Sequence, residues 1–331
     1  MSFEAIQGQS QALAFLERAI ATDRLAHAYA FVGPSGVGRK LTALAFAGRL
    51  LCAEGRGCGE CSPCRKVAAR THPDLHLIEP TPPGDNPKGG LAIRIAEARA
   101  LVRGAAFHPF EGPWKIFILD DAERMNLETV NALLKTLEEP PPRTLVILIL
   151  GHVRLLPATV LSRCQVVRFR PLSDGVVARL LQERAALSSE AAAVLARVTQ
   201  GRIGLALAAA TGSWLEDRDR LVTRLSAGRL DDLFALAEEV GRDRARAERL
   251  VELCWFWFRD LLILKGGGGP ELVINGDRVE ALSAQARLLS LDAIVERLGQ
   301  VKAIWAGLQG NVSPRLSLEV AFSRLAVAEA A

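Results

Sequence analysis

The chain has 331 residues with 50% hydrophobic content, which is enough to bury substantial cores in two or three domains. Its net charge of +4 neither demands nor excludes a nucleic-acid partner. The longest apolar run, Leu145 to Leu150, is far shorter than the roughly 20 residues that span a membrane. The first residues carry no basic, signal-like segment, so we expect a soluble, cytoplasmic protein.

A glycine-rich turn follows the first predicted helix, in residues 1–25, and the apolar strand Tyr29–Val32. The turn has the sequence GPSGVGRK at residues 33–40 and opens onto a helix predicted to end near Leu51. Glycine lets successive backbone N–H groups point at an anion at a helix N-terminus, so a strand, such a turn and a helix form a phosphate cradle. The spacing is that of a P-loop, and the candidate nucleotide-binding residues in the turn are Gly33, Ser35, Gly36, Gly38, Arg39 and Lys40.

Two residues of this loop depart from the motif, which asks for Lys and then Ser or Thr. Arg39 and Lys40 stand at those positions. Arg39 can still contact phosphate, but Lys40 has no oxygen with which to hold magnesium. Thr42 does not replace it, because two residues along a helix is about 200° around the axis. The loop has the shape of an ATP site and lacks part of its chemistry.

Four cysteines lie within thirteen residues, at Cys52, Cys58, Cys61 and Cys64. The last three have C-x2-C-x2-C spacing, so the four thiolates can converge on one tetrahedral zinc ion. Unrelated reduced cysteines and a redox pair are the alternatives. The density of thiols and the absence of an open ligand position favour a closed structural zinc site.

Strands and helices alternate up to about residue 170. Strands are predicted at residues 75–78, 115–121 and 145–151, helices at 93–102 and 127–137, and a turn-rich loop at 81–90. This alternation predicts a three-layer α/β domain with a mostly parallel sheet, in which ligands lie at the carboxyl edge of the strands.

The strand at 115–121 ends in Asp120 and Asp121. In a P-loop protein an acid pair at this place holds magnesium and polarises water, although a plain polar strand terminus has the same sequence. Asp121 stands where a glutamate usually activates the water. The shorter side chain withdraws the carboxylate by about 1 Å, which can cost about a hundredfold in rate.

Beyond Pro171 only helices are predicted. Short helices at 176–184, 189–198 and 204–210 precede longer amphipathic helices beyond residue 213, which a glycine-rich linker at 266–270 interrupts. Acids interleave the arginines from Arg242 to Arg249, which favours a solvated helix face over a nucleic-acid contact. The aromatic run Trp255–Phe258 is interpreted as helix core or subunit interface rather than a base-stacking platform.

Several stretches together resemble one family. They are HAYAF at 27–31 with the P-loop, the cysteine cluster, EGPWKIFILDDAERM at 111–125, NALLKTLEEPP at 131–141 and LSRC at 161–164. Over residues 1–172 the chain is similar to the clamp-loader subunits of bacterial DNA polymerase III, members of the AAA+ ATPase superfamily. A weaker similarity extends to FRDLL at 258–262.

The resemblance implies a fold and a domain order. An α/β P-loop AAA+ domain with an inserted zinc module at 52–64 is expected at residues 1–171, a small three-helix lid domain at 172–212, and an all-α collar domain for oligomerisation at 213–331. The zinc module departs from the family in one respect, since five residues separate Cys52 and Cys58 where eight are usual.

Four positions differ from the family's motor subunits. The motors carry Gly-Lys-Thr or Gly-Lys-Ser in the loop, a Glu after the Walker B Asp, a Thr in the first sensor and an Arg in the second. Those positions read here Gly38-Arg39-Lys40, Asp121, residues 150–152 and Gly204. The Ser162-Arg163-Cys164 motif is intact, and the resemblance implies that Arg163 reaches into a neighbouring subunit's ATP site as an arginine finger.

The chain therefore resembles a stationary, non-hydrolysing member of the loader. The implied partners are the gamma/tau and delta subunits and, through the complex, the sliding clamp and primer-template DNA. Alone the chain would have no activity, and it would act within the DNA polymerase III holoenzyme, a nucleotidyltransferase complex. No Mg²⁺ is expected in its own loop, and the sequence leaves open whether ATP or ADP still binds there without hydrolysis. The alternative is an ATP-hydrolysing motor similar to gamma or tau, in which Arg39 substitutes for the loop lysine.

Overall fold

The computed structural model describes residues 3–82, 91–227, 229–309 and 312–325. The chain divides into two compact units, the first made of Met1–Val176 with Gly201–Gly204 and the second of Val177–Gln200 with Leu205–Ala331. The three-part division expected from the sequence stays a prediction. In the part of the chain that the structure describes, no helix has the length and apolar character needed to cross a membrane.

The first unit is built on a five-stranded parallel sheet in the order β2-β3-β4-β1-β5. The strands are β1 (Ala28–Val32), β2 (Leu75–Ile78), β3 (Lys115–Leu119), β4 (Thr144–Leu150) and β5 (Gln165–Arg168). Every residue of β1, β3 and β4 is buried, as expected for strands that are covered on both faces. The mostly parallel sheet predicted from the sequence is confirmed.

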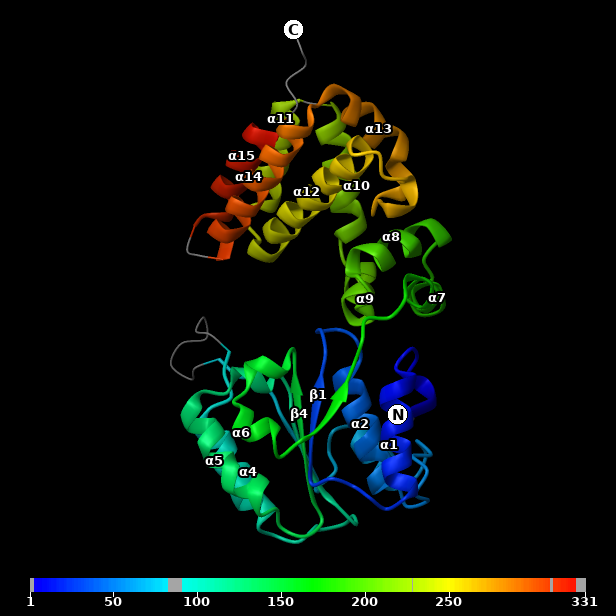
Figure 1. Ribbon diagram of the computed structural model, residues 1–331, viewed down its shortest axis with the longest axis vertical. Helices are drawn as coiled ribbons and strands as arrows, with labels where there is room; N and C mark the ends of the chain where they lie inside the picture. Colours follow the sequence, from blue (N-terminus) through cyan, green and yellow to red (C-terminus); the bar gives the residue numbers. More distant parts are fainter. Residues whose placement is uncertain (1–2, 83–90, 228, 310–311, 326–331) are drawn as a thin grey trace. The chain divides into compact units, whose positions relative to one another are not determined.

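Helices cover both faces of this sheet (Figure 1). They are α1 (Ser10–Ala21), α2 (Arg39–Leu51), α3 (Ser62–Ala68), α4 (Ile95–Ala105), α5 (Leu127–Glu138) and α6 (Ala158–Leu161). Because side chains alternate along a strand, Tyr29 and Phe31 pack in the core with α1 and α2, whereas Ala30 and Val32 pack in the core with α4 and α5. The result is a three-layer α/β unit in which all five strands end at the same edge.

The second unit is helical. Its helices are α7 (Asp174–Ala185), α8 (Ser189–Thr199), α9 (Ile203–Thr211), α10 (Trp214–Ala227), α11 (Leu230–Val240), α12 (Arg244–Lys265), α13 (Val279–Leu288), α14 (Leu291–Gln309) and α15 (Pro314–Leu325). The first residues of α7 and α9 belong to the first unit. Helix α12 packs against α10, α13, α14 and α15. Trp257 and Phe258 are fully buried, so the aromatic run contributes to the helix core.

The arginine run at 242–249 differs in part from the expected solvated face, since Arg242 is exposed but Arg246 is drawn inward. The guanidinium of Arg246 donates to both carboxylate oxygens of Asp217, which is fully buried on α10. A buried carboxylate needs a charged or hydrogen-bonding partner, so this pair ties α10 to α12. In the FRDLL stretch, Asp260 accepts hydrogen bonds from the N–H groups of Ile274 and Asn275 at 2.9 and 2.8 Å.

Two further differences concern connecting segments. The short helices α3 and α6 were not predicted, because four to seven residues carry too little periodicity to be recognised. The predicted turn-rich loop at 81–90 lies mostly outside the described residues. Thr81 itself pairs with Ala92 in an antiparallel bridge.

Candidate nucleotide site and cysteine cluster

The predicted nucleotide-site residues meet at the carboxyl edge of the sheet. The glycine-rich loop follows β1, Asp120 follows β3, and Gly151 follows β4. Glu79, which the sequence analysis did not single out, follows β2 at the same edge. This is the edge at which parallel α/β sheets bind their ligands.

The loop has the backbone of a phosphate cradle. Gly36 and Gly38 have φ angles of +82° and +99°, which favour glycine. A Cβ on Gly33 would lie 2.4 Å from the carbonyl oxygen of Phe169, so only glycine fits there without a shift. Gly38 has open space around it, and Ser35 is exposed. The loop thus retains its shape, and the changes that matter concern its charged side chains.

Arg39 is buried at the start of α2, with 5% of its surface exposed. Burial lowers the pKa of its guanidinium, and the nearby charges of Glu123, Asp120 and Asp121 oppose that effect. Its Nη1 is buried and has no hydrogen-bond partner among the described residues. The cation that was expected to contact phosphate therefore lies within the field of the chain's own acids.

Lys40 makes direct contact with acids of the same edge. Its Nζ lies 3.0 Å from Oδ2 of Asp120 and also donates a hydrogen bond to Glu79. Burial lowers the pKa of the ammonium, but the hydrogen bonds to Glu79 and Asp120 outweigh burial and raise it. A fixed positive charge therefore bridges β2, β3 and α2 beside the aspartate that would serve a magnesium site.

Thr42 does not supply the missing magnesium ligand. Its side chain is fully buried, and its hydroxyl donates to the carbonyl oxygen of Gly38 at 2.9 Å, within the first turn of α2. The hydroxyl is therefore committed to the helix backbone, as its angle around the helix axis predicted.

Asp121 also departs from a catalytic arrangement. It has a φ angle of +44°, in the left-handed region that residues other than glycine rarely adopt. Its Oδ2 lies 3.7 Å from Nε of the neighbouring Arg124. The carboxylate that would activate water thus has a cationic partner on the adjacent turn.

The two sensor positions do not carry the Thr and the Arg of a motor; of residues 150–152 only His152 is polar, and its Nδ1 accepts a hydrogen bond from the N–H of Arg154 at 3.1 Å. Leu150 is fully buried at the end of β4, and the N–H of Gly151 donates to Oε1 of Glu123 at 3.0 Å. The N–H of Gly204 donates to the carbonyl oxygen of Gly36 at 2.8 Å. A Cβ on Gly204 would lie 3.1 Å from Cα of Gly36, so a larger side chain there would require the loop to shift.

Arg163 lies on the turn between α6 and β5. The neighbouring Cys164 packs against the sheet core, and its burial raises the pKa of the thiol to about 12. The guanidinium is partly exposed; Nη2 donates to Oε1 of Glu138 and Nη1 to the carbonyl oxygen of Thr159, both at 2.6 Å. The root of Arg163 is thus anchored, while its head contacts groups of its own chain.

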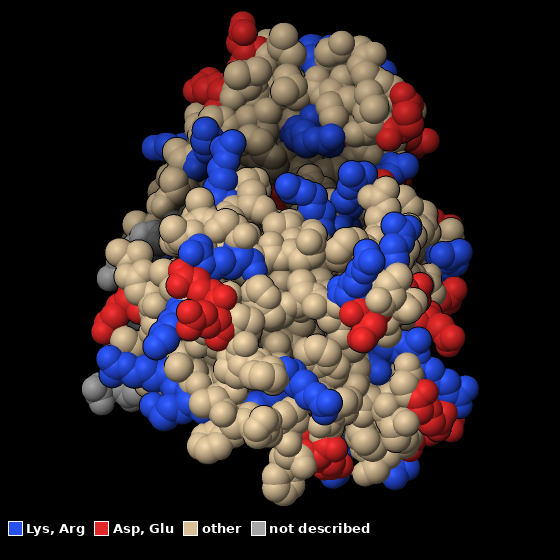
Figure 2. Space-filling view, turned by 60° about the horizontal axis from the view of Figure 1, so that its bottom comes forward, with Lys and Arg blue, Asp and Glu red and all other residues tan. Residues whose placement is uncertain are grey.

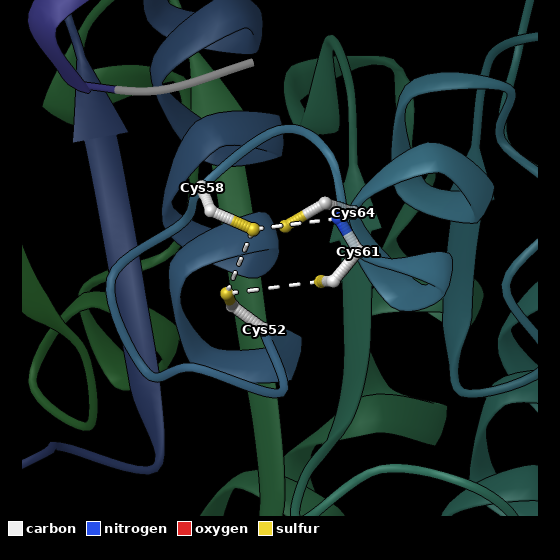
Figure 3. Close-up of side chains that lie close together, drawn as sticks. All are labelled: Cys52, Cys58, Cys61 and Cys64. Atoms are coloured by element: carbon white, nitrogen blue, oxygen red, sulfur yellow. Dashed lines mark hydrogen bonds between the residues drawn. The ribbon is translucent and has the colours of Figure 1, made fainter.

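The four predicted cysteine ligands come together (Figure 3). Cys52 follows the end of α2, Cys58 and Cys61 lie in the connecting loop, and Cys64 is on α3. Their sulfur atoms all lie within 4.8 Å of one another. The Sγ of Cys52 is 3.7 Å from that of Cys58 and 3.8 Å from that of Cys61. A tetrahedral site with Zn–S bonds of about 2.3 Å has S–S edges of about 3.8 Å.

The electrostatics of this cluster suit a bound cation. Burial raises the pKa of Cys52, but N–H groups of the surrounding backbone outweigh it and lower the pKa to about 6. Burial and the neighbouring thiols raise the pKa of Cys64 to about 12. Several thiolates at this spacing repel one another, and a metal ion removes that repulsion. The distance of 3.7 Å between the sulfur atoms of Cys52 and Cys58 shows that the shortened connection between them does not displace Cys52 from the cluster.

Three acids that the sequence analysis did not select lie beside the predicted site residues. Glu79 and Glu123 lie around the nucleotide loop, and Glu138 contacts Arg163. Glu79 directly follows a predicted strand, so the shared carboxyl edge of the parallel strands could have revealed it. Glu138 and Arg163 are 25 residues apart on different elements, and no periodicity connects them.

Charges of both signs are interspersed on the face shown in Figure 2. This mixture agrees with the small net charge of +4. Overall charge therefore gives no argument for a nucleic-acid interface on the face that is shown.

A parallel α/β sheet with a glycine-rich loop after its first strand and aspartates after a neighbouring strand defines a P-loop NTPase type of domain. The chain belongs to the family described as "DNA polymerase III, delta subunit", whose model matches residues 8–173, half of the chain. The predicted resemblance to clamp-loader subunits is confirmed.

Three relatives illustrate the match. The chain is 26% identical to DNA polymerase III subunit delta′ of Bacillus subtilis, over 92% of each chain. It is 27% identical to subunit tau of the same organism, over 98% of this chain and 61% of tau. Its fold is similar to that of a DNA polymerase III, gamma subunit-related protein from Thermotoga maritima, known from a crystal structure. That match has a TM-score of 0.50 and 16% identity over 93% of this chain and 97% of that one.

Proposed function

We propose that the chain is a delta′-type subunit of a DNA polymerase III clamp loader that does not hydrolyse ATP and acts as its stator. In this role it assembles with gamma/tau and delta subunits in the cytoplasm and, through the complex, acts on the sliding clamp and primer-template DNA. Residues 172–212 would form its lid and residues 213–331 its collar.

The observation that carries this proposal is the ion pair of Lys40. An active site of this class holds Mg²⁺ between the loop hydroxyl and the Walker B aspartate. Here the residue at the hydroxyl position is a cation, and its Nζ is 3.0 Å from Asp120. A second positive ion beside this ammonium would be repelled, and its carboxylate ligand is already neutralised. Without the metal, the charge that develops on a transferring phosphoryl group lacks the divalent counter-ion that active sites of this class use.

The other features of the site support the same conclusion. Arg39 lies close to three acids and Asp121 pairs with Arg124. The N–H of Gly204 contacts the loop where a motor would present an arginine. The charge of Arg39 is balanced by acids of the same site, and the contacts of Asp121 and Gly204 are formed without nucleotide.

The contribution of the chain to catalysis would be Arg163. A guanidinium pairs with two phosphate oxygens as charge develops, which a lysine does poorly. Arg163 is partly exposed on a turn whose next residue is anchored in the core. The stator would thus complete the ATP site of a neighbouring motor subunit.

The cysteine cluster would hold one structural Zn²⁺ through Cys52, Cys58, Cys61 and Cys64. Zinc supplies no reaction here, because four thiolates leave no open coordination position. It would fix the connection between α2 and α3.

The test is stoichiometric binding of ATP and ADP by the purified chain, with Mg²⁺ and with EDTA, alongside its ATPase rate. We expect no ATPase above background, with or without primed DNA, and no gain in binding from Mg²⁺. Metal-dependent binding together with turnover that Arg39→Ala abolishes would instead identify a motor. That alternative draws support from the similarity to tau over 98% of the chain.

A further inference from the structure

Arg163 has a charged partner within its own chain. Glu138 is the last residue of α5, and its Oε1 accepts a hydrogen bond from Nη2 of Arg163 at 2.6 Å. The other side of the guanidinium donates from Nη1 to the carbonyl oxygen of Thr159 at 2.6 Å and to Oγ of Ser162 at 3.3 Å. Nη2 carries two N–H groups, and a phosphate oxygen that approaches the one bonded to Glu138 must take the place of the carboxylate oxygen.

We propose that Glu138 is a positioning residue that holds the guanidinium of Arg163 on its own chain until the γ-phosphate of a neighbour's ATP displaces it. This inference rests on the proposed arginine-finger function. It adds that Glu138 competes with the phosphate for the Nη2 N–H group that it accepts from.

The strength of this ion pair suits such a competition. The two side chains are 32% and 47% exposed, so water screens their attraction. Exposed pairs of this kind favour the paired state by a factor of about two to five. A triphosphate carries more charge than one carboxylate, so it can displace Glu138, while the pair still determines where the free guanidinium lies.

The contacts of the rest of the turn limit the exchange of partners to a movement of the Arg163 guanidinium, while the backbone stays in place. Cys164 is packed against the core beside the sheet, and Oγ of Ser162 donates to the carbonyl oxygen of Thr159 at 3.1 Å. The backbone under Arg163 is therefore held from both sides. Exchange of partners requires rotation of the Arg163 side chain and no refolding of α6.

The competition is relieved when ATP binds, because the γ-phosphate is already charged in the ground state. Loss of Glu138 should consequently lower the apparent KM for ATP at the served site, that is, the neighbouring subunit's ATP site that Arg163 enters. It should leave kcat at that site nearly unchanged. A residue with a merely structural role would instead change both constants or the thermal stability of the chain.

The experiment uses the complete clamp-loader complex reconstituted with wild-type chain, Glu138→Ala, Arg163→Ala or the double variant. Glu139→Ala is the matched control, because it removes the neighbouring exposed carboxylate. DNA-stimulated ATPase is measured over a range of ATP concentrations at low and high salt, and melting curves check the folding of each chain.

We expect Glu138→Ala to raise the rate at subsaturating ATP by about 1.5- to 3-fold, since other ATP sites dilute the two- to fivefold effect at the served site. The increase should shrink at high salt and be absent in the Arg163→Ala background. Glu139→Ala should behave as wild type.

An unchanged or lower rate for Glu138→Ala, with Arg163→Ala still defective, would overturn only the positioning role. An increase that persists without Arg163 would overturn it as well. If Arg163→Ala has the wild-type rate, the arginine-finger function fails, and the role of Glu138 fails with it.

Discussion

Replacement of Lys40 by threonine tests whether the ammonium takes the place of magnesium. The substitution removes the contacts with Asp120 and Glu79 and restores a hydroxyl in the first turn of α2. Partly exposed ion pairs contribute about 0.2–1 kcal/mol each. A lysine at a helix N-terminus costs about 0.3–1 kcal/mol through the helix dipole, so the two effects largely cancel. Without divalent metal, the melting temperature should therefore change little.

The response to Mg²⁺ should change much more. Without Lys40, two carboxylates and a hydroxyl face one another, a set of oxygens that Mg²⁺ prefers. If the new site has a Kd of about 1 mM, a tenfold excess of Mg²⁺ stabilises the variant by about 1.4 kcal/mol. This corresponds to a rise in melting temperature of about 3–6 °C for a unit of this size.

The assay is thermal unfolding during titration with MgCl₂, with an ionic-strength control in NaCl. Lys135→Thr, at an exposed position on α5, controls for the loss of a surface lysine. Wild type and the control should not respond. Equal responses to Mg²⁺ in wild type and Lys40→Thr would refute the claim that the ammonium excludes the metal.

Two other predictions concern stability. Metal analysis of chain purified without chelator should give about one zinc per chain. The double variant Cys61→Ser, Cys64→Ser should lose the zinc and have a lower melting temperature, while the helical unit stays folded. A wild-type chain without zinc would contradict this prediction. Asp74→Asn should destabilise the α/β unit by about 3 kcal/mol, because the fully buried carboxylate accepts three N–H groups from residues 110–112. These hydrogen bonds outweigh burial and lower the pKa of Asp74, so its stabilising contribution is present above the unfolded pKa of about 3.9 and lost as pH falls through the lower folded value. Denaturant unfolding from pH 7 to pH 2 checks it, and identical pH profiles for the variant and wild type would be incompatible with this role.

Local sequence patterns predicted the elements that form the α/β unit. The strand at 75–78 has the predicted bounds and the helix after the loop ends at Leu51 as predicted, although it begins at Arg39, two residues before the predicted start. The cysteine cluster could also be predicted, since four thiols within thirteen residues, the last three at C-x2-C-x2-C spacing, form the pattern of a structural zinc site. In each case the signal and the structure it specifies lie in the same short stretch.

Contacts between distant residues could not be predicted in this way. In the sequence, Lys40 indicates only that a magnesium ligand is missing. The structure shows that its ammonium lies against Asp120, because β2 and β3 end at the same edge of the sheet. The arginines on α12 alternate with acids, which predicts solvation, yet Asp217 on α10 draws Arg246 inward. Such pairings depend on which elements become neighbours, and spacing along the chain does not encode that.

The central claim is that the chain contributes to catalysis through Arg163 and not through its own loop. The most direct measurement is DNA-stimulated ATPase and clamp loading by a complex reconstituted with Arg163→Ala. An arginine finger raises the rate of hydrolysis by about 10³- to 10⁵-fold at the site it enters. Arg163 would affect only one of the several ATP sites of the complex. We predict normal assembly and zinc content with a clear loss of ATPase and loading, and Arg163→Lys should restore little. Wild-type rates with Arg163→Ala would contradict the claim.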